Sequence, residues 1–184
     1  MTLRLNGSTS GYVEIDAPAA AGSNTLILPD GNGTANHSLV NDGSGNLSWF
    51  NGGPAFSAYP DVATNVANVT FTKINLQVED YDTGNCFASS RFTPNVAGYY
   101  LFTMAVQATA LAQLAPILYI NGAMRYWGNS MGSNTFDSNG VAIAYMNGTT
   151  DYAEMYAYQA SGGSAFINDQ RYRTFFQGIL IRPA

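Results

Sequence analysis

Apolar side chains occupy every second position in the run that begins at Gly98. Tyr100, Phe102, Met104 and Val106 fall on one side of an extended chain, because successive side chains of a strand point to opposite faces. The glycine at the start of the run is typical of a turn that delivers a strand. The pattern therefore predicts a long β-strand with one strongly apolar face.

Comparable short runs recur through residues 54–184, and turns containing Gly or Asn separate most of them. Asn121-Gly122 and Asn147-Gly148 are strong turn signals. Strands that recur at such intervals, without helical periodicity, are typical of a sandwich or a jelly roll. The expected strands are 69–74, 98–109, 116–120, 140–145, 151–158, 165–167 and 174–181.

Residues 1–53 have a different character and are predicted as a separate small part. Three or four short alternating runs are joined by turns rich in Asp-Gly and Asn-Gly, which suit β-hairpins. The apolar content is thin, and about 50 residues without a disulfide or metal rarely fold well alone. We expect this part to be an anchor or stem that needs two further copies or a large surface beneath it. Asn51-Gly-Gly-Pro54 is a natural linker to residues 54–184.

Charged residues make up 10% of the chain, against about 25% in ordinary domains. One interpretation is an extracellular type of β protein with a polar, nearly uncharged surface. The other, which we favour, is an obligate oligomer, because subunit interfaces are depleted in charge. The seven basic residues are scattered, so nucleic acid is not an expected partner. No run of 18 apolar residues predicts insertion into a membrane.

The redox and targeting signals are sparse. Cys86 is the single cysteine, which fits synthesis in a reducing cytoplasm. The first residues lack the basic and then apolar layout of a secretory signal. The only histidine, His37, lies in a Gly/Asn-rich stretch, and no obvious His partner stands near Cys86. No catalytic residue is therefore expected, and the chain is predicted not to be an enzyme.

One acidic stretch is a candidate metal site. Asp80 and Asp82, followed by Thr83 and Asn85, gather the oxygen ligands that calcium prefers within one loop. The alternative interpretation is that this stretch is simply a solvated turn. Calcium is the only candidate cofactor.

Exposed aromatic residues are the second kind of candidate site. Tyr126 and Trp127 follow the Asn121-Gly122 turn, and aromatic faces suit sugar rings because each has an apolar body and a polar edge. The pair is predicted to bind a ligand, with packing between subunits as the alternative.

The spacing Phe92-x5-Gly98-x-Tyr100-x-Phe102 resembles the signature of the complement globular-head (C-one-q) domain. Met104 stands where the family has an aromatic residue. Further blocks keep the family's order along residues 54–184, namely Asp82, Phe87, Leu118–Gly122 and Phe176–Leu180.

This resemblance implies a ten-stranded jelly roll similar to tumour necrosis factor and assembled as a tight homotrimer. Aromatic residues of the long strand and of 151–158 are then expected to pack at the trimer axis. The residues assigned to this trimer core are Tyr100, Phe102, Tyr152, Tyr156 and Tyr158, and contact with sugar rings is the alternative for the three tyrosines of 151–158.

The run from Gly7 to Pro29 is similar to segments of tailed-bacteriophage fibre and virion surface proteins. Together the two parts predict a non-enzymatic structural protein of a bacteriophage virion surface, made in the host cytoplasm. Residues 1–53 would dock onto other virion proteins of the capsid or tail. The trimeric knob would be a short fibre tip or a capsid decoration, with a host glycan or receptor as a candidate partner. The alternatives are a secreted recognition module and a polysaccharide depolymerase.

Overall fold

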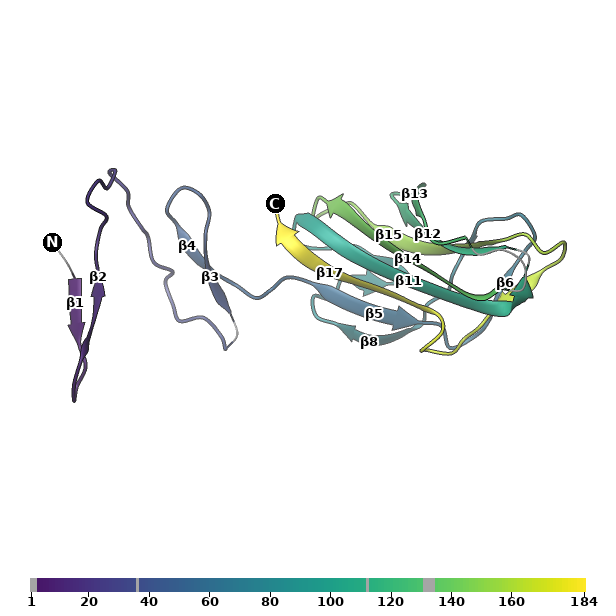
Figure 1. The fold of residues 1–184 in the computed structure, drawn as a ribbon, viewed down its shortest axis with the longest axis horizontal. Coiled ribbons are helices and arrows are strands. Elements are labelled where there is room, and N and C mark those ends of the chain that lie inside the picture. The colour runs from purple at the N-terminus through teal and green to yellow at the C-terminus, as the bar shows by residue number, and fades with distance from the viewer. Residues whose placement is uncertain (1–2, 36, 112, 131–134) are drawn as a thin grey trace. The chain divides into compact units, whose positions relative to one another are not determined.

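The structure is a computed structural model that describes residues 3–35, 37–111, 113–130 and 135–184. These residues form strands, turns and irregular segments, and none of them forms a helix, so the all-β prediction is confirmed. The chain divides into two compact units, Met1–Asn51 and Gly52–Ala184 (Figure 1). This boundary lies two residues before the predicted one, within the expected Gly-rich linker.

The first unit consists of two antiparallel hairpins. Strand β1 (Leu3–Asn6) pairs with β2 (Tyr12–Ile15), and β3 (Ser38–Asn41) pairs with β4 (Leu47–Phe50). The Asp42 carboxylate accepts hydrogen bonds from backbone amides in the second turn, as turn-forming aspartates do. The predicted hairpins are therefore present.

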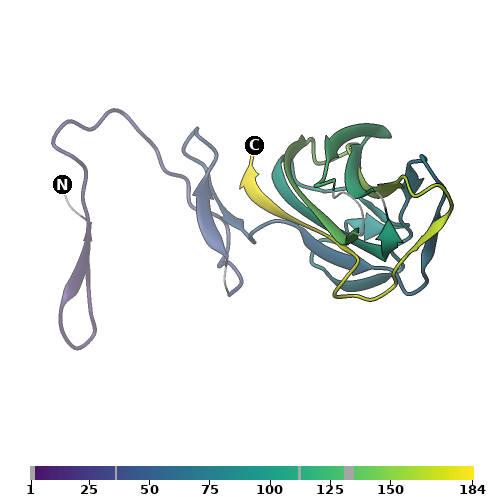
Figure 2. The same ribbon diagram turned by 45° about the vertical axis from the view of Figure 1, so that its right-hand side comes forward.

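The second unit is a sandwich of two antiparallel sheets (Figure 2). The larger one is called the β11 sheet after its central strand, which pairs with β14 on one side and β17 on the other. Strands β5 and β8 continue beyond β17, and β16 and β6 extend the sheet at the far end of β11. Its strands are β5 (Ala55–Tyr59), β6 (Thr64–Val66), β8 (Val78–Asp82), β11 (Gly98–Leu111), β14 (Thr135–Met146), β16 (Ala165–Ile167) and β17 (Phe175–Pro183).

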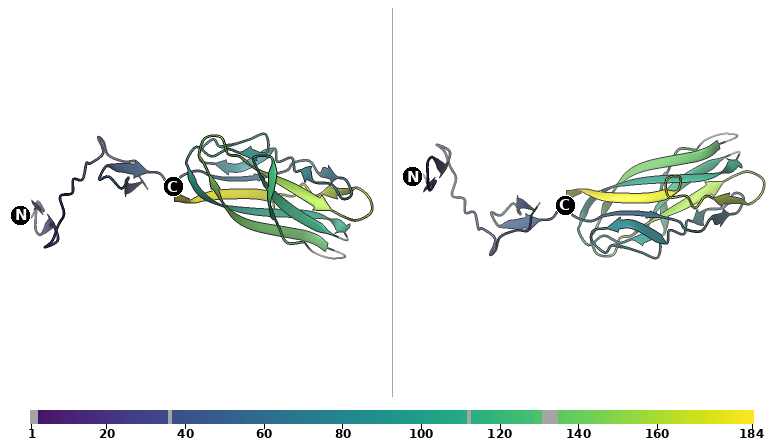
Figure 3. Two further views of the ribbon diagram at one scale, coloured as in Figure 1. Left: turned by 90° about the horizontal axis from the view of Figure 1, so that it is seen from above. Right: turned by 90° about the horizontal axis from the view of Figure 1, so that it is seen from below.

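The other sheet is called the β15 sheet. Strand β15 lies between β12 and β10 and also pairs with β7, whereas β13 and β9 form the edges. The long strands of both sheets run along the second unit (Figure 3). The strands of the β15 sheet are β7 (Thr72–Lys73), β9 (Phe87–Ala88), β10 (Arg91–Phe92), β12 (Leu114–Ile120), β13 (Ala123–Trp127) and β15 (Ala153–Gln159).

The core between the sheets is built around stacked aromatic rings. The ring of Phe56 lies 4.4 Å from that of Phe92 and 4.9 Å from that of Phe176, measured between centroids. Phe102 stacks on Phe176 at 5.7 Å. Gly178 faces this cluster, and a Cβ atom there would lie 2.5 Å from a ring carbon of Phe56. Only a residue without a side chain lets the rings pack this closely.

Two residues assigned to the trimer core prove to belong to this interior. Tyr100 and Phe102 are fully enclosed by their own chain, with 0% of each side chain exposed. The Tyr100 hydroxyl donates to the carbonyl of Val96 at 2.7 Å, which satisfies its polar end. Their assignment to the subunit interface is wrong, because the side of β11 that carries them faces the interior of the sandwich.

The strand pattern differs from expectation in detail. Among the described residues, the second unit contains thirteen strand segments, several of only two or three residues, where ten strands were expected. The predicted strands at 98–109, 116–120, 151–158 and 174–181 correspond to β11, β12, β15 and β17. The region around Trp127, which resembles a loop in sequence, forms the edge strand β13.

Candidate functional site

The outer face of the β11 sheet exposes a broad apolar surface. Residues that alternate with the core positions form a row across three strands, in which Ile143 pairs with Leu101 and Leu101 with Ile179. Tyr99 and Tyr145 pair in the next row, with ring centroids 5.6 Å apart. Most members are about half exposed, which is unusual for large apolar residues gathered on one face. We call this surface the apolar face: Tyr99, Leu101, Val141, Ile143, Tyr145, Ile179 and Ile181.

A ladder of polar side chains crosses the same sheet beside this face. Thr103 donates to Gln177 at 3.2 Å, Gln177 to Ser57 at 3.1 Å, and Ser57 to Asp80 at 3.1 Å. Arg171 closes the ladder with an ion pair to Asp80 at 2.9 Å. These bonds link β11, β17, β5 and β8 in a defined register.

The two carboxylates of the predicted metal site have separate roles. Asp80 belongs to the polar ladder, whereas Asp82 accepts hydrogen bonds from the amides of Phe87, at 2.7 Å, and Gly84, at 3.3 Å. Among the described residues, no group of three or more His, Cys, Asp or Glu side chains could hold a metal ion. Calcium binding stays a prediction, which a fall in melting temperature on adding a chelator would support.

The outer face of the β15 sheet carries a group of half-exposed aromatic rings. Trp127 and Tyr158 lie 5.1 Å apart, and Phe71 lies 5.1 Å from Tyr158 and 5.6 Å from Trp127. Tyr119 connects this group to Tyr156, on which it stacks at 3.9 Å. We call these five residues the aromatic patch. They come from β12, β13, β15 and the segment before β7, so the sheet assembles them from distant parts of the chain.

The predicted ligand-binding pair, Tyr126 and Trp127, is separated by the structure. Consecutive residues of β13 point to opposite faces, so only Trp127 joins the aromatic patch. Tyr126 turns towards β14, where its hydroxyl donates to the carbonyl of Ile143 at 2.9 Å. It therefore ties the edge of one sheet to the other.

The tyrosines of residues 152–158, on β15 and immediately before it, lie on this outer face and not on the apolar face of the β11 sheet. Tyr156 and Tyr158 belong to the aromatic patch, and Tyr152 contacts Arg91. Between these residues, Met155 and Ala157 point into the core with 0% exposure. The alternation predicted for 151–158 is present, but it places the tyrosines on a different surface from the exposed apolar residues.

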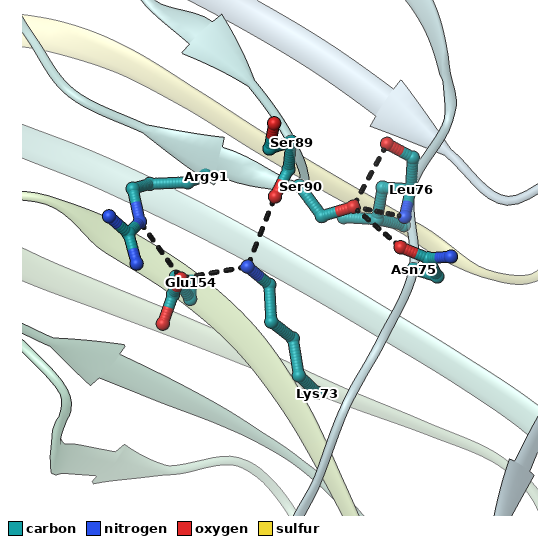
Figure 4. A network of polar contacts seen from close by, with 7 residues as sticks. All are labelled: Lys73, Asn75, Leu76, Ser89, Ser90, Arg91 and Glu154. Atoms are coloured by element: carbon teal, nitrogen blue, oxygen red, sulfur yellow. Dashed lines mark hydrogen bonds and ion pairs between the residues drawn. The ribbon is translucent and has the colours of Figure 1, made fainter.

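Lys73, Arg91 and Glu154 form an ion network (Figure 4). It lies beside the aromatic patch, because Lys73 on β7 pairs with Tyr156 on β15. Glu154 is almost fully buried, and its Oε1 atom accepts from Lys73 Nζ at 2.8 Å and from Arg91 Nε at 2.9 Å. Lys73 also donates to the carbonyl of Ser89 at 3.0 Å. Burial disfavours the charged carboxylate, but the hydrogen bonds and charges of Lys73 and Arg91 outweigh it and hold the pKa of Glu154 below its usual value.

A tight hairpin positions Arg91 for this network. Strands β9 and β10 are joined by Ser89 and Ser90, and both residues have positive φ, at 53° and 57°, as the central pair of a type I′ turn requires. The buried Ser90 hydroxyl accepts from the amide of Leu76 at 2.7 Å and fixes the turn against the neighbouring segment (Figure 4).

A surface hollow of about 580 Å³ opens next to the two cations. Lys73, Ser89, Arg91 and Thr93 are among the residues that line it. The guanidinium of Arg91 lies 3.8 Å above the ring of Tyr152.

Sequence reasoning missed Lys73, Arg91 and Glu154 as site residues. The alternation of 152, 154, 156 and 158 was the available signal, since it places Glu154 on the same face as three tyrosines.

In the first unit, apolar side chains are largely exposed within the single chain. Trp49 has a local partner, because it donates from Nε1 to the carbonyl of Gly31 at 2.8 Å. Most other large apolar residues of the hairpins and of the intervening segment are accessible to solvent, whereas Val40, Leu47 and Phe50 are half-buried. The accessible ones are Leu3, Leu5, Tyr12, Val13, Ile15, Leu26, Ile27, Leu28 and Leu39, each at least 46% exposed.

Among the described residues, the structure has no helix with the length and apolar character needed to span a membrane.

Comparison with known proteins gives a likeness of fold. No protein-family model matches the chain, and a search of curated proteins found no match. Solved structures do match. The globular domain of zebrafish complement 1qA protein has 16% identity and a TM-score of 0.54, and the match covers 72% of this chain and 99% of that one.

Two further structures extend the comparison. Murine APRIL has a TM-score of 0.55 and 10% identity, covering 70% of this chain and 98% of that one. The PRD1 vertex protein P5 has a TM-score of 0.54 and 14% identity, covering 70% and 97%. The second unit is thus a jelly roll similar in fold to C-one-q globular domains and tumour-necrosis-factor-like domains.

Proposed function

We propose that this chain is a non-enzymatic structural protein that forms a trimeric knob on the surface of a bacteriophage virion. The second unit would be the knob, and the first unit would attach it to other virion proteins. The likeness to the PRD1 vertex protein P5 supports a place on a particle shell for this fold. The protein would be made in the host cytoplasm and function on the assembled particle.

The observation that carries the proposal is the apolar face of the β11 sheet. Ile143, Ile179 and Tyr145 are each about half exposed in the single chain. Burial of such a contiguous surface stabilises an assembly by about 25 cal/mol for each Å² of apolar area removed from water. The threefold arrangement follows from the resemblance to C-one-q domains, in which three jelly rolls pack together.

The exposed apolar residues of the first unit support its role as an attachment segment. Isolated two-stranded hairpins are at best marginally stable in water, and β1–β2 and β3–β4 are two such hairpins. Contact with a capsid or tail surface, or with the first units of two other copies, would bury these residues. Two placements fit, a short fibre tip and a capsid decoration.

Light scattering on the purified full chain tests the assembly. We expect a trimer that Ile143→Glu converts to smaller species, because a charge on the apolar face is costly to bury. Val62→Glu is the matched control, since Val62 is exposed outside this face. A wild-type monomer in dilute solution would refute the trimer.

Mass spectrometry of purified particles tests the location. The chain should be found in virions at a ratio to the major capsid protein that agrees with trimers, and antibody labelling should place it at the head or the tail. Its consistent absence from intact virions that were produced while the chain was expressed would contradict the virion role.

A further inference from the structure

The outer face of the β15 sheet combines aromatic rings with two cationic side chains, Lys73 and Arg91, whose hydrogen-bond donors are only partly paired within the chain. We propose that this face binds acidic glycans, in which a carboxylate on a sugar contacts Arg91 and Lys73 and neighbouring sugar rings lie on the aromatic patch. This inference rests on the proposed function, because it specifies the host molecule that the knob would touch.

The arrangement of aromatic rings indicates a saccharide as the ligand. Trp127, Phe71 and Tyr158 form one group of rings, and the Tyr119–Tyr156 stack forms the next, so the rings follow one another along the sheet. Phe71 and Trp127 are 39% and 41% exposed, which leaves ring surface open to solvent. Binding sites for small molecules typically combine such apolar walls with a few polar groups.

The local charge indicates that the saccharide is acidic. Two cations, Lys73 and Arg91, share a single oxygen of Glu154, so the network carries one positive charge in excess. The chain as a whole has a net charge of −5, so the local positive charge of this surface is opposite in sign to the charge of the protein. A ligand carboxylate would balance the excess charge, whereas a neutral sugar would not.

The position of Arg91 allows its guanidinium to bind the carboxylate of such a ligand. Its Nε atom is held by Glu154, and among the described residues no group accepts a hydrogen bond from its two terminal nitrogens. The side chain is 44% exposed and borders the hollow next to Lys73. A guanidinium fixed at one end presents its remaining donors as a fork that matches a carboxylate with two parallel hydrogen bonds.

The site is already ordered without a ligand. Glu154 accepts a hydrogen bond from Arg91 Nε, and the ring of Tyr152 lies 3.8 Å from the guanidinium. The Ser89–Ser90 turn holds β10, the strand that carries Arg91. Tyr152, immediately before β15, and Tyr158 near its end are separated by about 20 Å, since an extended chain rises about 3.3 Å per residue. This length accommodates a short oligosaccharide with its acidic group at the Tyr152 end. Preorganisation of this kind lowers the entropy cost of binding.

Calorimetry with two matched pairs of probes tests the proposal on the full-length protein. The first pair is an oligogalacturonate and its methyl ester, which share a backbone but differ in charge. The second pair is sialyllactose and lactose. We expect at least one acidic probe to bind more tightly than its uncharged counterpart. Binding of neither acid, or equal binding of acid and uncharged counterpart, would overturn the inference.

Variants locate the site. Arg91→Gln and Trp127→Ala should each raise the Kd for the acidic probe by roughly tenfold or more, because each removes one major contact. Arg4→Gln, which changes the charge equally but lies in the first unit, should leave the Kd unchanged. Circular dichroism and light scattering confirm that each variant keeps its fold and assembly. Unchanged binding by a folded Arg91→Gln protein would refute the site, and it would leave the trimer and the virion role standing.

Discussion

Lys73 and Glu154 are 81 positions apart in the chain, and Nζ of the lysine lies 2.8 Å from Oε1 of the glutamate. Strand β7 pairs with β15 so that Lys73 lies opposite Tyr156, next to Glu154 on the same face. Arg91 reaches the same oxygen from β10. A single buried carboxylate thus links three strands of the β15 sheet.

Replacing this carboxylate should destabilise the second unit. Glu154→Gln keeps the shape but removes the charge that both cations contact, and we expect a loss of about 2 kcal/mol in the free energy of unfolding. Urea denaturation followed by tryptophan fluorescence measures the difference. Glu79→Gln is the control, because Glu79 is exposed on β8. Equal stability of Glu154→Gln and wild type would contradict the structural role of the network.

The same carboxylate should make stability depend on pH. Because the folded protein holds the pKa of Glu154 below its usual value, the stabilisation is complete above the unfolded pKa of about 4.3 and declines as the pH falls below it. The melting temperatures of wild type and Glu154→Gln should therefore differ at neutral pH and converge in acid. A difference that stays constant down to strongly acidic pH would contradict this assignment.

Gly178 should not accept a side chain. An added Cβ atom would lie 2.5 Å from Phe56 and 3.0 Å from Phe102, and overpacking of this kind costs about 1–3 kcal/mol. Thermal denaturation of Gly178→Ala should show a clear loss of stability. Gly163→Ala is the matched control, since no atom lies within 4 Å of the added group there. Equal melting temperatures of the two variants would contradict the described packing of the aromatic core.

The Ser90 hydroxyl should contribute more than its neighbour does. Ser90→Ala leaves the buried amide of Leu76 without its acceptor, which costs about 1–3 kcal/mol. Ser89→Ala is a close control, because Ser89 has nearly the same backbone conformation and its side chain is exposed. Hydrogen exchange at the Leu76 amide reports the change directly, and equal exchange rates in the two variants would refute the role of Ser90.

Tyr126 and Trp127 should behave differently although they are adjacent. Tyr126→Phe removes a hydrogen bond to Ile143 and should lower stability by about 1 kcal/mol without weakening the binding of an acidic probe. Trp127→Ala should weaken that binding. Calorimetry and denaturation on both variants separate the two effects. Loss of binding in Tyr126→Phe would show that Tyr126 contacts the ligand, as the sequence had predicted.

The alternation of residues 98–109 was sufficient to predict β11, and the spacing from Phe92 to Phe102 was sufficient to indicate the jelly roll. The alternation alone did not show which face of β11 is buried in the core and which is exposed. Tyr99 and Leu101 on one face are nearly as apolar as Tyr100 and Phe102 on the other. A period of two identifies two faces, and only the packing of the second sheet decides which of them is covered.

The candidate binding surface was harder to predict for a related reason. Strands β7 and β10 have two residues each, too short to show any period. Their residues Lys73 and Arg91 reach Glu154 only through pairing with β15. Tyr126 and Trp127 look like one aromatic site in sequence, but strand geometry directs them to opposite sides.

The two hairpins of the first unit contain almost no enclosed apolar side chain, so each copy has little free energy of its own to resist opening. A protease added to free subunits should therefore cut there first and release an intact jelly roll. The same peptide bonds would be shielded once the segment is seated on its partner surface. Under the proposed virion role, the digestion pattern would thus distinguish free copies from copies bound in a particle.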